Sequence, residues 1–212
     1  MVLKILNGNE MRQNIYVYSC EATNEGVIID PGHNFEETKK YVKENEIKIT
    51  KILLTHGHYD HLLHAREAAD FYNASLCCHK NEKEMLIDPS INFSNRVFRT
   101  PVSFFPDMLL EEGDEVRVGK GMLKVLHTPG HTPGCICFYD EASSKIFTGD
   151  TLFLESIGRT DFPKSSTEAI IKNIKEKLFT LPECVEAYPG HGEKTSIGHE
   201  IKHNEIVKEL CL

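Results

Sequence analysis

The apolar and polar positions of the chain follow two periods, and each period predicts one kind of element. Short apolar runs typical of β-strands recur, at 2–6, 14–20, 26–29, 51–55, 75–79, 122–127, 135–139, 145–148 and 185–188. Between some of them, apolar residues recur three and four positions apart, which predicts helices at 35–45, 61–72, 166–179 and 196–210. In the last helix one apolar stripe is expected to face the core, formed by Ile197, Ile201, Ile206 and Leu210.

The order of these elements indicates the fold class. Both halves of the chain begin with strands and continue with helices, which predicts an α/β sandwich with helices on the outer faces of two packed sheets. The chain has 212 residues, of which 40% are hydrophobic, and this is enough to bury a core within one domain. We therefore expect a single domain over residues 1–212.

The segment 88–107 does not fit either period. It holds three prolines and several aromatic residues, and we expect a long functional loop or cover there. Its phenylalanines, Phe93, Phe98, Phe104 and Phe105, fit two interpretations. They either wall a substrate channel or fix the loop to the core, and the second is the simpler expectation.

Charge and composition exclude several classes of partner. There are 24 basic and 32 acidic residues, a net charge of −8, so no broad basic face is expected and nucleic acid is excluded as a partner. No signal sequence is evident, and no apolar run approaches the roughly 20 residues of a membrane helix. The seven cysteines show no paired spacing, which favours reduced thiols. We expect a cytoplasmic protein without a membrane partner, as a monomer or homodimer.

Polar residues cluster directly after the apolar run 51–55. The segment 56–61 reads His-Gly-His-Tyr-Asp-His. In an extended segment residues two apart point the same way, so His56, His58 and Asp60 can converge. Asp60 can also start the following helix and turn His61 inward. One short loop thus offers four candidate ligands.

The same arrangement recurs three times in the second half. His131, Asp150 and His191 each follow an apolar run and a glycine. The ends of strands are where α/β sheets gather their site residues, and glycine lets the backbone turn sharply there. So many buried polar groups would lack partners unless they bind something. The sequence therefore predicts a metal site.

The number and type of these residues predict two ions. Seven ligands are too many for one tetrahedral centre. They divide naturally if Asp150 bridges the two ions, with His56, His58 and His131 on one and Asp60, His61 and His191 on the other. Imidazole and carboxylate without thiolate suit divalent zinc, iron or manganese, and zinc is our first expectation.

The pattern Thr-His-Gly-His-Tyr-Asp-His at 55–61, followed by His131, Asp150 and His191, resembles the metallo-β-lactamase superfamily across nearly the whole chain. The segments 147–153 and 156–163 look like the short, hydroxyacylglutathione hydrolase-like branch of its glyoxalase II-like enzymes. The resemblance implies a four-layer αβ/βα sandwich of two mixed sheets with the metals at one edge. It supports the two-metal division and assigns Asp30 to the second shell of the metals.

The chain departs from full-length glyoxalase II in two ways. We expect no C-terminal helical part of the kind that helps to hold glutathione. Asp161 and Glu193 also stand where glutathione-binding tyrosines are expected. The thiol carrier of the substrate can therefore be a thiol other than glutathione. The true β-lactamases commonly place a cysteine where Asp150 stands, so we expect no antibiotic hydrolysis.

The resemblance implies a hydrolase that cleaves S-acyl, such as S-lactoyl, thioesters of a small thiol. A hydroxide bridging the metals would attack the carbonyl, with Asp60 orienting it. A thiolate leaves readily, because a free thiol has a pKa near about 8.5. Arg159 fits a substrate carboxylate and a structural pair with Asp161 equally well.

Two other functions remain open. A mononuclear iron persulfide dioxygenase, another branch of the superfamily, carries a segment like 158–162 and would need only His56, His131 and Asp150 as ligands. Metal count and oxygen uptake separate it from the hydrolase. A metal-binding module without turnover is the alternative outside enzymology.

Overall fold

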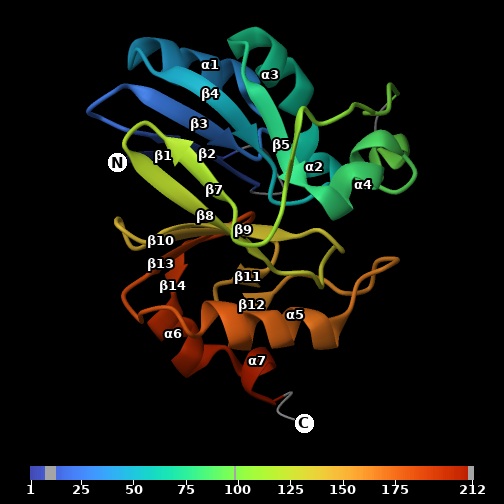
Figure 1. Cartoon of the computed structure of the whole chain (residues 1–212). Coiled ribbons are helices and arrows are strands. Elements are labelled where there is room, and N and C mark those ends of the chain that lie inside the picture. Colours follow the sequence, from blue (N-terminus) through green and yellow to red (C-terminus); the bar gives the residue numbers. More distant parts are fainter. Residues whose placement is uncertain (8–12, 98, 210–212) are drawn as a thin grey trace.

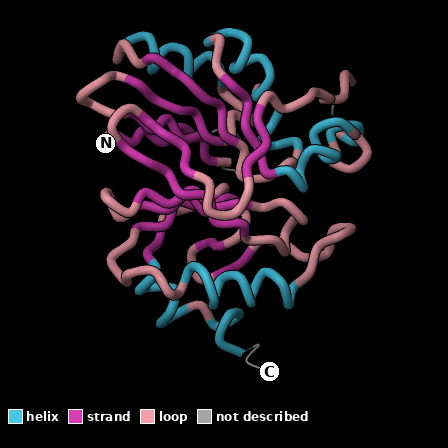
Figure 2. The backbone as a smooth tube through the Cα atoms, viewed as in Figure 1, coloured by secondary structure: helices cyan, strands magenta, loops and turns pink. Residues whose placement is uncertain are grey.

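Two sheets pack face to face with helices on both outer sides (Figure 1, Figure 2). The structure is a computed structural model, and it describes residues 1–7, 13–97 and 99–209. The layers follow the order helix, sheet, sheet, helix. This confirms the expected four-layer αβ/βα sandwich. The first sheet and its helices come from the first half of the chain, and the second sheet and its helices come from the second half.

The first sheet has six strands in sequence order. They are β1 (Val2–Asn7), β2 (Asn14–Ser19), β3 (Glu25–Ile29), β4 (Lys48–Leu53), β5 (Ser75–His79) and β6 (Met108–Leu110). The first three strands pair antiparallel, and β3 to β6 pair parallel. Because parallel neighbours end at the same edge, the loops that follow β3, β4 and β5 lie together.

The second sheet also has six strands, in the order β14-β13-β10-β9-β8-β7. They are β7 (Glu115–Val118), β8 (Gly121–His127), β9 (Ile136–Asp140), β10 (Lys145–Gly149), β13 (Glu186–Pro189) and β14 (Thr195–Ser196). Only β10 and β13 pair parallel. A small separate ladder joins β11 (Leu152–Phe153) and β12 (Ser156–Ile157).

Helices cover the outer face of each sheet (Figure 1). The first half holds α1 (Phe35–Glu44), α2 (Tyr59–Leu62), α3 (Ala65–Tyr72) and α4 (Lys83–Ile87), with 3₁₀ turns at Lys80–Glu82 and Ser94–Arg96. The second half holds α5 (Thr167–Asn173), extended by a π-helical turn at Ile174–Leu178, then α6 (Ile197–His203) and α7 (Glu205–Glu209). No helix among residues 1–7, 13–97 and 99–209 is long and apolar enough to cross a bilayer.

Three apolar clusters form the core, one between the sheets and one under each helical layer. Strand β3 shows the pattern, since Val27 and Ile29 face the cluster between the sheets and Ile28 faces the helices of the first half. Both faces of the central strands are therefore buried. This explains why they are continuous apolar runs rather than alternating ones.

The predicted helix 61–72 is wrong in its continuity, because the structure breaks it into α2 and α3. The backbone N–H of His64 donates to the carbonyl of Pro31 rather than to a helical carbonyl. The helix also begins earlier than expected, with His58 as the N-cap and Asp60 within the first turn. Asp60 therefore does not start the helix, although His61 does face inward and is buried.

The predicted helix 196–210 is also interrupted. It breaks at Asn204, whose side chain donates to Ser156 and Glu200 and accepts the backbone N–H of Val207. The break changes the phase of the apolar stripe. Val207 is buried, whereas Ile206 is 39% exposed. The expected stripe is therefore wrong beyond Ile201, and Leu210 lies outside the described residues.

Strand bounds agree with the prediction except at a few places. The strand predicted at 51–55 runs from Lys48 to Leu53, because the N–H of Thr55 is taken by the Asp30 carboxylate and not by a strand. The short strands β6, β7, β11, β12 and β14 were not predicted. The segment 88–107 holds only the 3₁₀ turn Ser94–Arg96 among its described residues, as expected for a loop.

Candidate metal centre

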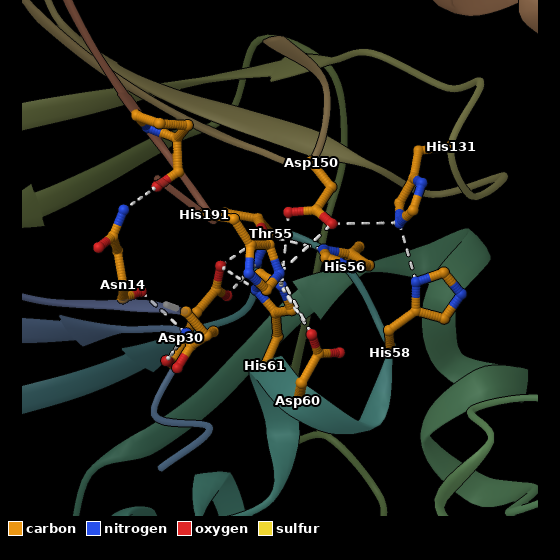
Figure 3. A network of polar contacts seen from close by, with 12 residues as sticks. Asn14, Asp30, Thr55, His56, His58, Asp60, His61, His131, Asp150 and His191 are labelled. Carbon is orange, nitrogen blue, oxygen red and sulfur yellow. Dashed lines mark hydrogen bonds and ion pairs between the residues drawn. The ribbon is translucent and has the colours of Figure 1, made fainter. Parts of the chain in front are cut away.

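The seven predicted ligands lie together where loops from the two sheets meet (Figure 3). The loop after β4 brings four of them, and the loops after β8, β10 and β13 bring one each. The set is His56, His58, Asp60, His61, His131, Asp150 and His191. Three subsets have donor atoms that all lie within 4.8 Å of one another, and each subset has the spacing of a metal site.

The first subset is His56, His58 and His131. His58 Nδ1 lies 2.8 Å from His131 Nε2. The other ring nitrogen of His131, Nδ1, donates to the carbonyl of Arg159 at 2.8 Å, so Nε2 carries the lone pair that faces His58. Figure 3 shows His58 and His131 together on one side of the site.

The second subset is Asp60, His61 and His191. His191 Nε2 lies 3.2 Å from Asp60 Oδ2 and 3.2 Å from His61 Nε2. The other nitrogen of His61, Nδ1, donates to Asp30 Oδ2 at 2.9 Å. Asp60 and the two imidazoles thus converge on one point.

Asp150 lies between the two subsets. Its Oδ1 is 3.4 Å from His61 Nε2, and its Oδ2 is 3.5 Å from His131 Nε2. Together with His56 and His61 it forms the third subset. One carboxylate therefore reaches both sides, which is the geometry expected of a bridging ligand.

Asp30 is buried behind His61, at the end of β3. Besides the bond to His61, its two oxygens accept the backbone N–H of Thr55 at 2.8 Å and the Thr55 hydroxyl at 2.6 Å. Its φ of 51° lies in the left-handed region, which aspartate tolerates better than most residues. A carboxylate in this place fixes the tautomer and orientation of a ligand imidazole. Asp30 thus lies behind a predicted ligand, and its role toward a bound metal stays a prediction.

The charges of the cluster divide it into two parts. Burial, together with the neighbouring His131, lowers the pKa of His58 to about 3, so this imidazole is neutral and offers a lone pair. Burial also lowers the pKa of His61, but the three surrounding aspartates outweigh burial and raise it to about 10. The aspartate-rich part therefore stabilises positive charge.

These donors fit divalent metal ions. His56 Nε2 is buried and has no hydrogen-bond partner among the described residues. A buried nitrogen without a partner is costly, and a metal bond would satisfy it. The donors are imidazole nitrogen and carboxylate oxygen, which suit zinc, iron and manganese. The site is therefore suited to divalent metal ions.

A cavity of about 510 Å³ opens above the cluster. One wall is formed by Phe93 and Phe162, whose ring centroids lie 5.4 and 4.8 Å from that of His58. Two guanidinium groups line the same cavity, each 4.6 Å from a phenylalanine ring centroid: Arg96 over Phe93 and Arg159 over Phe162. The cavity therefore combines aromatic surface with positive charge.

Of the wall residues, only Phe93 and Arg159 were among the sequence candidates. Arg159 pairs with both carboxylate oxygens of Asp161, at 3.0 and 2.7 Å, so the structural pair exists although the side chain also lines the cavity. Arg96 and Phe162 were missed. Arg96 has no carboxylate partner within the described part of the chain, and no sequence spacing relates it to the ligands.

The phenylalanines of the segment 88–107 divide between the two interpretations. Phe93 lines the cavity, and Phe104 is buried in the core beneath the helices of the first half. Phe105 is 66% exposed and does neither. Phe98 lies outside the described residues. The simpler expectation therefore holds for Phe104 and is wrong for Phe93.

A model of the metallo-beta-lactamase superfamily matches residues 8–191, most of the chain. The chain belongs to this superfamily. It is 34% identical to the probable metallo-hydrolase YqgX of Bacillus subtilis, over 92% of this chain and 93% of the relative. It is 33% identical to the hydroxyacylglutathione hydrolase GloC of Haemophilus influenzae, over 98% of both chains.

Solved structures of the superfamily agree with this assignment. The BLEG-1 B3 metallo-beta-lactamase superposes with a TM-score of 0.91 at 33% identity, covering 97% of this chain and 99% of that one. ETHE1 from Myxococcus xanthus gives 0.82 at 28% identity, covering 100% and 92%. TTHA1623 in a di-iron-bound form gives 0.82 at 29% identity, covering 96% and 98%. The chain therefore shares its fold, over at least 96% of its length, with superfamily members that carry different names.

Proposed function

We propose that this chain is a binuclear metallohydrolase that cleaves thioesters of a small thiol. The observation that carries the proposal is the pair of donor subsets joined by Asp150 at the floor of the cavity. The name of the relative from Haemophilus influenzae, a hydroxyacylglutathione hydrolase, supports the thioester. Cytoplasmic localisation, the single domain over 1–212 and the monomeric or homodimeric state stay predictions.

In this proposal one ion would be held by His56, His58 and His131, and the other by Asp60, His61 and His191. Asp150 would be shared between the two ions. Two close divalent ions would supply a water ionised near neutral pH and a Lewis acid for the substrate carbonyl. Zinc is the first expectation. Iron is the second candidate, because the similar protein TTHA1623 was solved in a di-iron-bound form. Manganese suits the same donors.

The residues of the chain position and polarise rather than donate protons. The His191 and His61 imidazoles beside Asp60 hold the pKa of its carboxyl well below its usual range against the opposing effect of burial. Asp60 is therefore an acceptor, able to orient the attacking water by a hydrogen bond. A thiolate leaving group has a free-thiol pKa of about 8.5, so cleavage needs no strong acid from the protein.

The wall of the cavity indicates the kind of substrate. Arg96 and Arg159 suit a substrate that carries a carboxylate or another anion, and the faces of Phe93 and Phe162 suit an apolar part of it. We propose that Arg96 carries more of this interaction, because Asp161 already neutralises Arg159. A small anionic thiol thioester matches both features.

The persulfide dioxygenase is the competing function, with a single iron on His56, His131 and Asp150. Two observations favour the hydrolase. Asp60 and His191 form a second subset with His61 instead of lying apart from the site, and Asp150 reaches toward both subsets. The alternative of a module without turnover has less support, because the full set of donor residues is in place.

The experiment that tests the proposal compares substrates on one protein preparation. The chain is incubated with S-lactoylglutathione, with a lactoyl thioester of a neutral thiol, with a β-lactam and with a persulfide in the presence of an oxygen electrode. We expect thioester hydrolysis that is lost in Asp60→Ala while the ion on His56, His58 and His131 persists. Oxygen uptake on the persulfide, or turnover of the β-lactam alone, would overturn the proposal.

A further inference from the structure

Glu82 is a fully buried carboxylate that lies between two loops of the metal centre. It follows β5, in the 3₁₀ turn Lys80–Glu82, and its exposed fraction is 0%. Its Oε2 accepts the backbone N–H of Gly57 at 2.7 Å. Its Oε1 accepts the hydroxyl of Thr132 at 2.8 Å and the backbone N–H of Gly134 at 2.6 Å. We call these three bonds the Glu82 bridge.

The Glu82 bridge joins the two halves of the molecule at one donor subset. Gly57 lies between His56 and His58, and Thr132 follows His131. Both glycines fit closely against Glu82. A Cβ at Gly57 would lie 2.9 Å from Oε2, and one at Gly134 would lie 2.7 Å from Oε1. The loops of all three histidines of this subset are therefore held by one carboxylate.

Ionised Glu82 depends on these donors. Burial raises the pKa of its carboxyl, and the bonds from Thr132, Gly134 and Gly57 oppose that shift. A buried carboxylate with fewer donors would be strongly destabilising. Burying a carboxylate here costs folding free energy, and side-chain packing alone does not explain why a carboxylate occupies this place.

A different residue joins the halves at the other subset. The side chain of Asn14, at the start of β2, donates to the carbonyls of Pro189 at 3.0 Å and Gly192 at 2.9 Å. Its backbone N–H donates to the carbonyl of Gly190 at 2.7 Å. We call these three bonds the Asn14 bridge. They hold the backbone on both sides of His191, because their acceptors precede and follow it in the chain. Figure 3 shows Asn14 near Asp30, on the side away from His58.

The same strand also reaches the residue that supports His61. The side chain of Gln13, next to Asn14, donates to the carbonyl of Asp30 at 2.9 Å. Asp30 in turn accepts the Nδ1–H of His61. The start of β2 therefore holds the loops behind both imidazoles of the second subset. Among the described residues, neither Gln13 nor Asn14 hydrogen-bonds to the loop of His131.

We infer that Glu82 and Asn14 are positioning residues, each of which aligns the ligands of one metal ion across the two halves of the molecule. The Glu82 bridge serves the ion on His56, His58 and His131, and the Asn14 bridge serves the ion on Asp60, His61 and His191. This inference rests on the proposed two-metal site but not on the proposed thioester substrate.

One substitution in each bridge keeps the size of the side chain but exchanges a hydrogen-bond acceptor for a donor, or a donor for an acceptor. In Glu82→Gln the amide nitrogen faces a backbone N–H whichever way it is turned, because each carboxylate oxygen accepts one. In Asn14→Asp a carboxylate faces two carbonyl oxygens. Glu84→Gln is the matched control, since Glu84 is exposed, lies two residues from Glu82 and pairs with Lys164.

The readout is the affinity of each ion, measured on the full chain by competition with a chromophoric zinc chelator. His131→Ala and His191→Ala identify which of the two ions belongs to which subset. We expect Glu82→Gln to weaken the ion that His131→Ala loses by about 10- to 100-fold, with the other ion unchanged. Asn14→Asp should weaken the ion that His191→Ala loses. Near-UV circular dichroism checks that each variant is folded.

Several outcomes would overturn the inference. Unchanged affinities would do so, and so would an equal loss of both ions in either variant, because a general structural role predicts no selectivity. If Glu82→Gln does not fold, Thr132→Val removes a single donor of the Glu82 bridge and should weaken the same ion by a few-fold. A parent chain that binds no metal would instead contradict the proposed function, so the two failures are distinguishable.

Discussion

The floor and the wall of the cavity differ in how firmly their residues are held. On the floor, His61 and His131 each make a second hydrogen bond, to Asp30 and to a backbone carbonyl, and both are buried. On the wall, Arg96 and Arg159 are exposed and rest on phenylalanine faces. The difference teaches that the floor is built to fix geometry and the wall to accept different ligands. We expect the floor to set the chemistry and the wall to set the substrate.

The largest effect is expected at the residue that both donor subsets share. Asp150→Ala should weaken both ions and lower kcat/KM by at least about 1,000-fold, because metal catalysis supplies several kcal/mol and each 1.36 kcal/mol is tenfold. Elemental analysis and a thioester assay measure the two quantities. Asp114→Ala, at an exposed turn, is the control. Retained activity in Asp150→Ala would place the chemistry elsewhere.

A smaller effect is expected one step behind the floor. In Asp30→Asn, an amide nitrogen in place of the oxygen that accepts from His61 would leave the imidazole N–H without an acceptor. Metal affinity should fall by about 10- to 100-fold, with the loss confined to the ion on His61. Chelator competition measures it. An equal loss at the His131 side would contradict the division of the floor into two subsets.

On the wall, the expected change is in KM and not in kcat. Arg96→Ala should raise KM for a carboxylate-bearing thioester by about tenfold, the value of one charge-assisted hydrogen bond. Metal content should not change. A thioester of a neutral thiol is the internal control, since its KM should stay the same. A fall in kcat with unchanged KM would remove the distinction between floor and wall.

The smallest effect is expected at Glu186, which lies at the far end of the strand that leads to His191. Hydrogen bonds from Lys145, Lys194 and Tyr188 lower the pKa of Glu186 from 4.5 to about 2. A folded-state pKa below the unfolded value stabilises the protein above about pH 4.3 and loses this contribution as pH falls toward 2. Urea unfolding of Glu186→Gln should therefore show a small deficit at pH 7 that narrows between pH 4.5 and 3. A deficit independent of pH would contradict this origin.

The floor could be predicted from the sequence, and the wall largely could not. Each floor residue follows the end of a buried strand, so the periodicity that locates the strands also locates the ligands. Arg96 and Phe162 lie in loops, and only the packing of the two halves brings them to the same cavity. Glu82 and Asn14 were missed for the same reason, because nothing local relates either one to the ligands.

The sequence pattern also could not predict where two of the helices are interrupted. The break before α3 depends on the carbonyl of Pro31, and the break at Asn204 depends on Ser156 and Glu200. These are tertiary hydrogen bonds that replace helical ones. An apolar period continues across such a break, so it predicts a helix where the fold needs two.

Metal content per chain, measured together with turnover of a lactoyl thioester, tests the central claim most directly. The protein is purified without added metal, analysed for zinc, iron and manganese, and assayed in the same preparation. The two donor subsets predict two ions per chain and thioester hydrolysis that a chelator removes. One iron per chain, with oxygen uptake on a persulfide and no hydrolysis, would contradict the account.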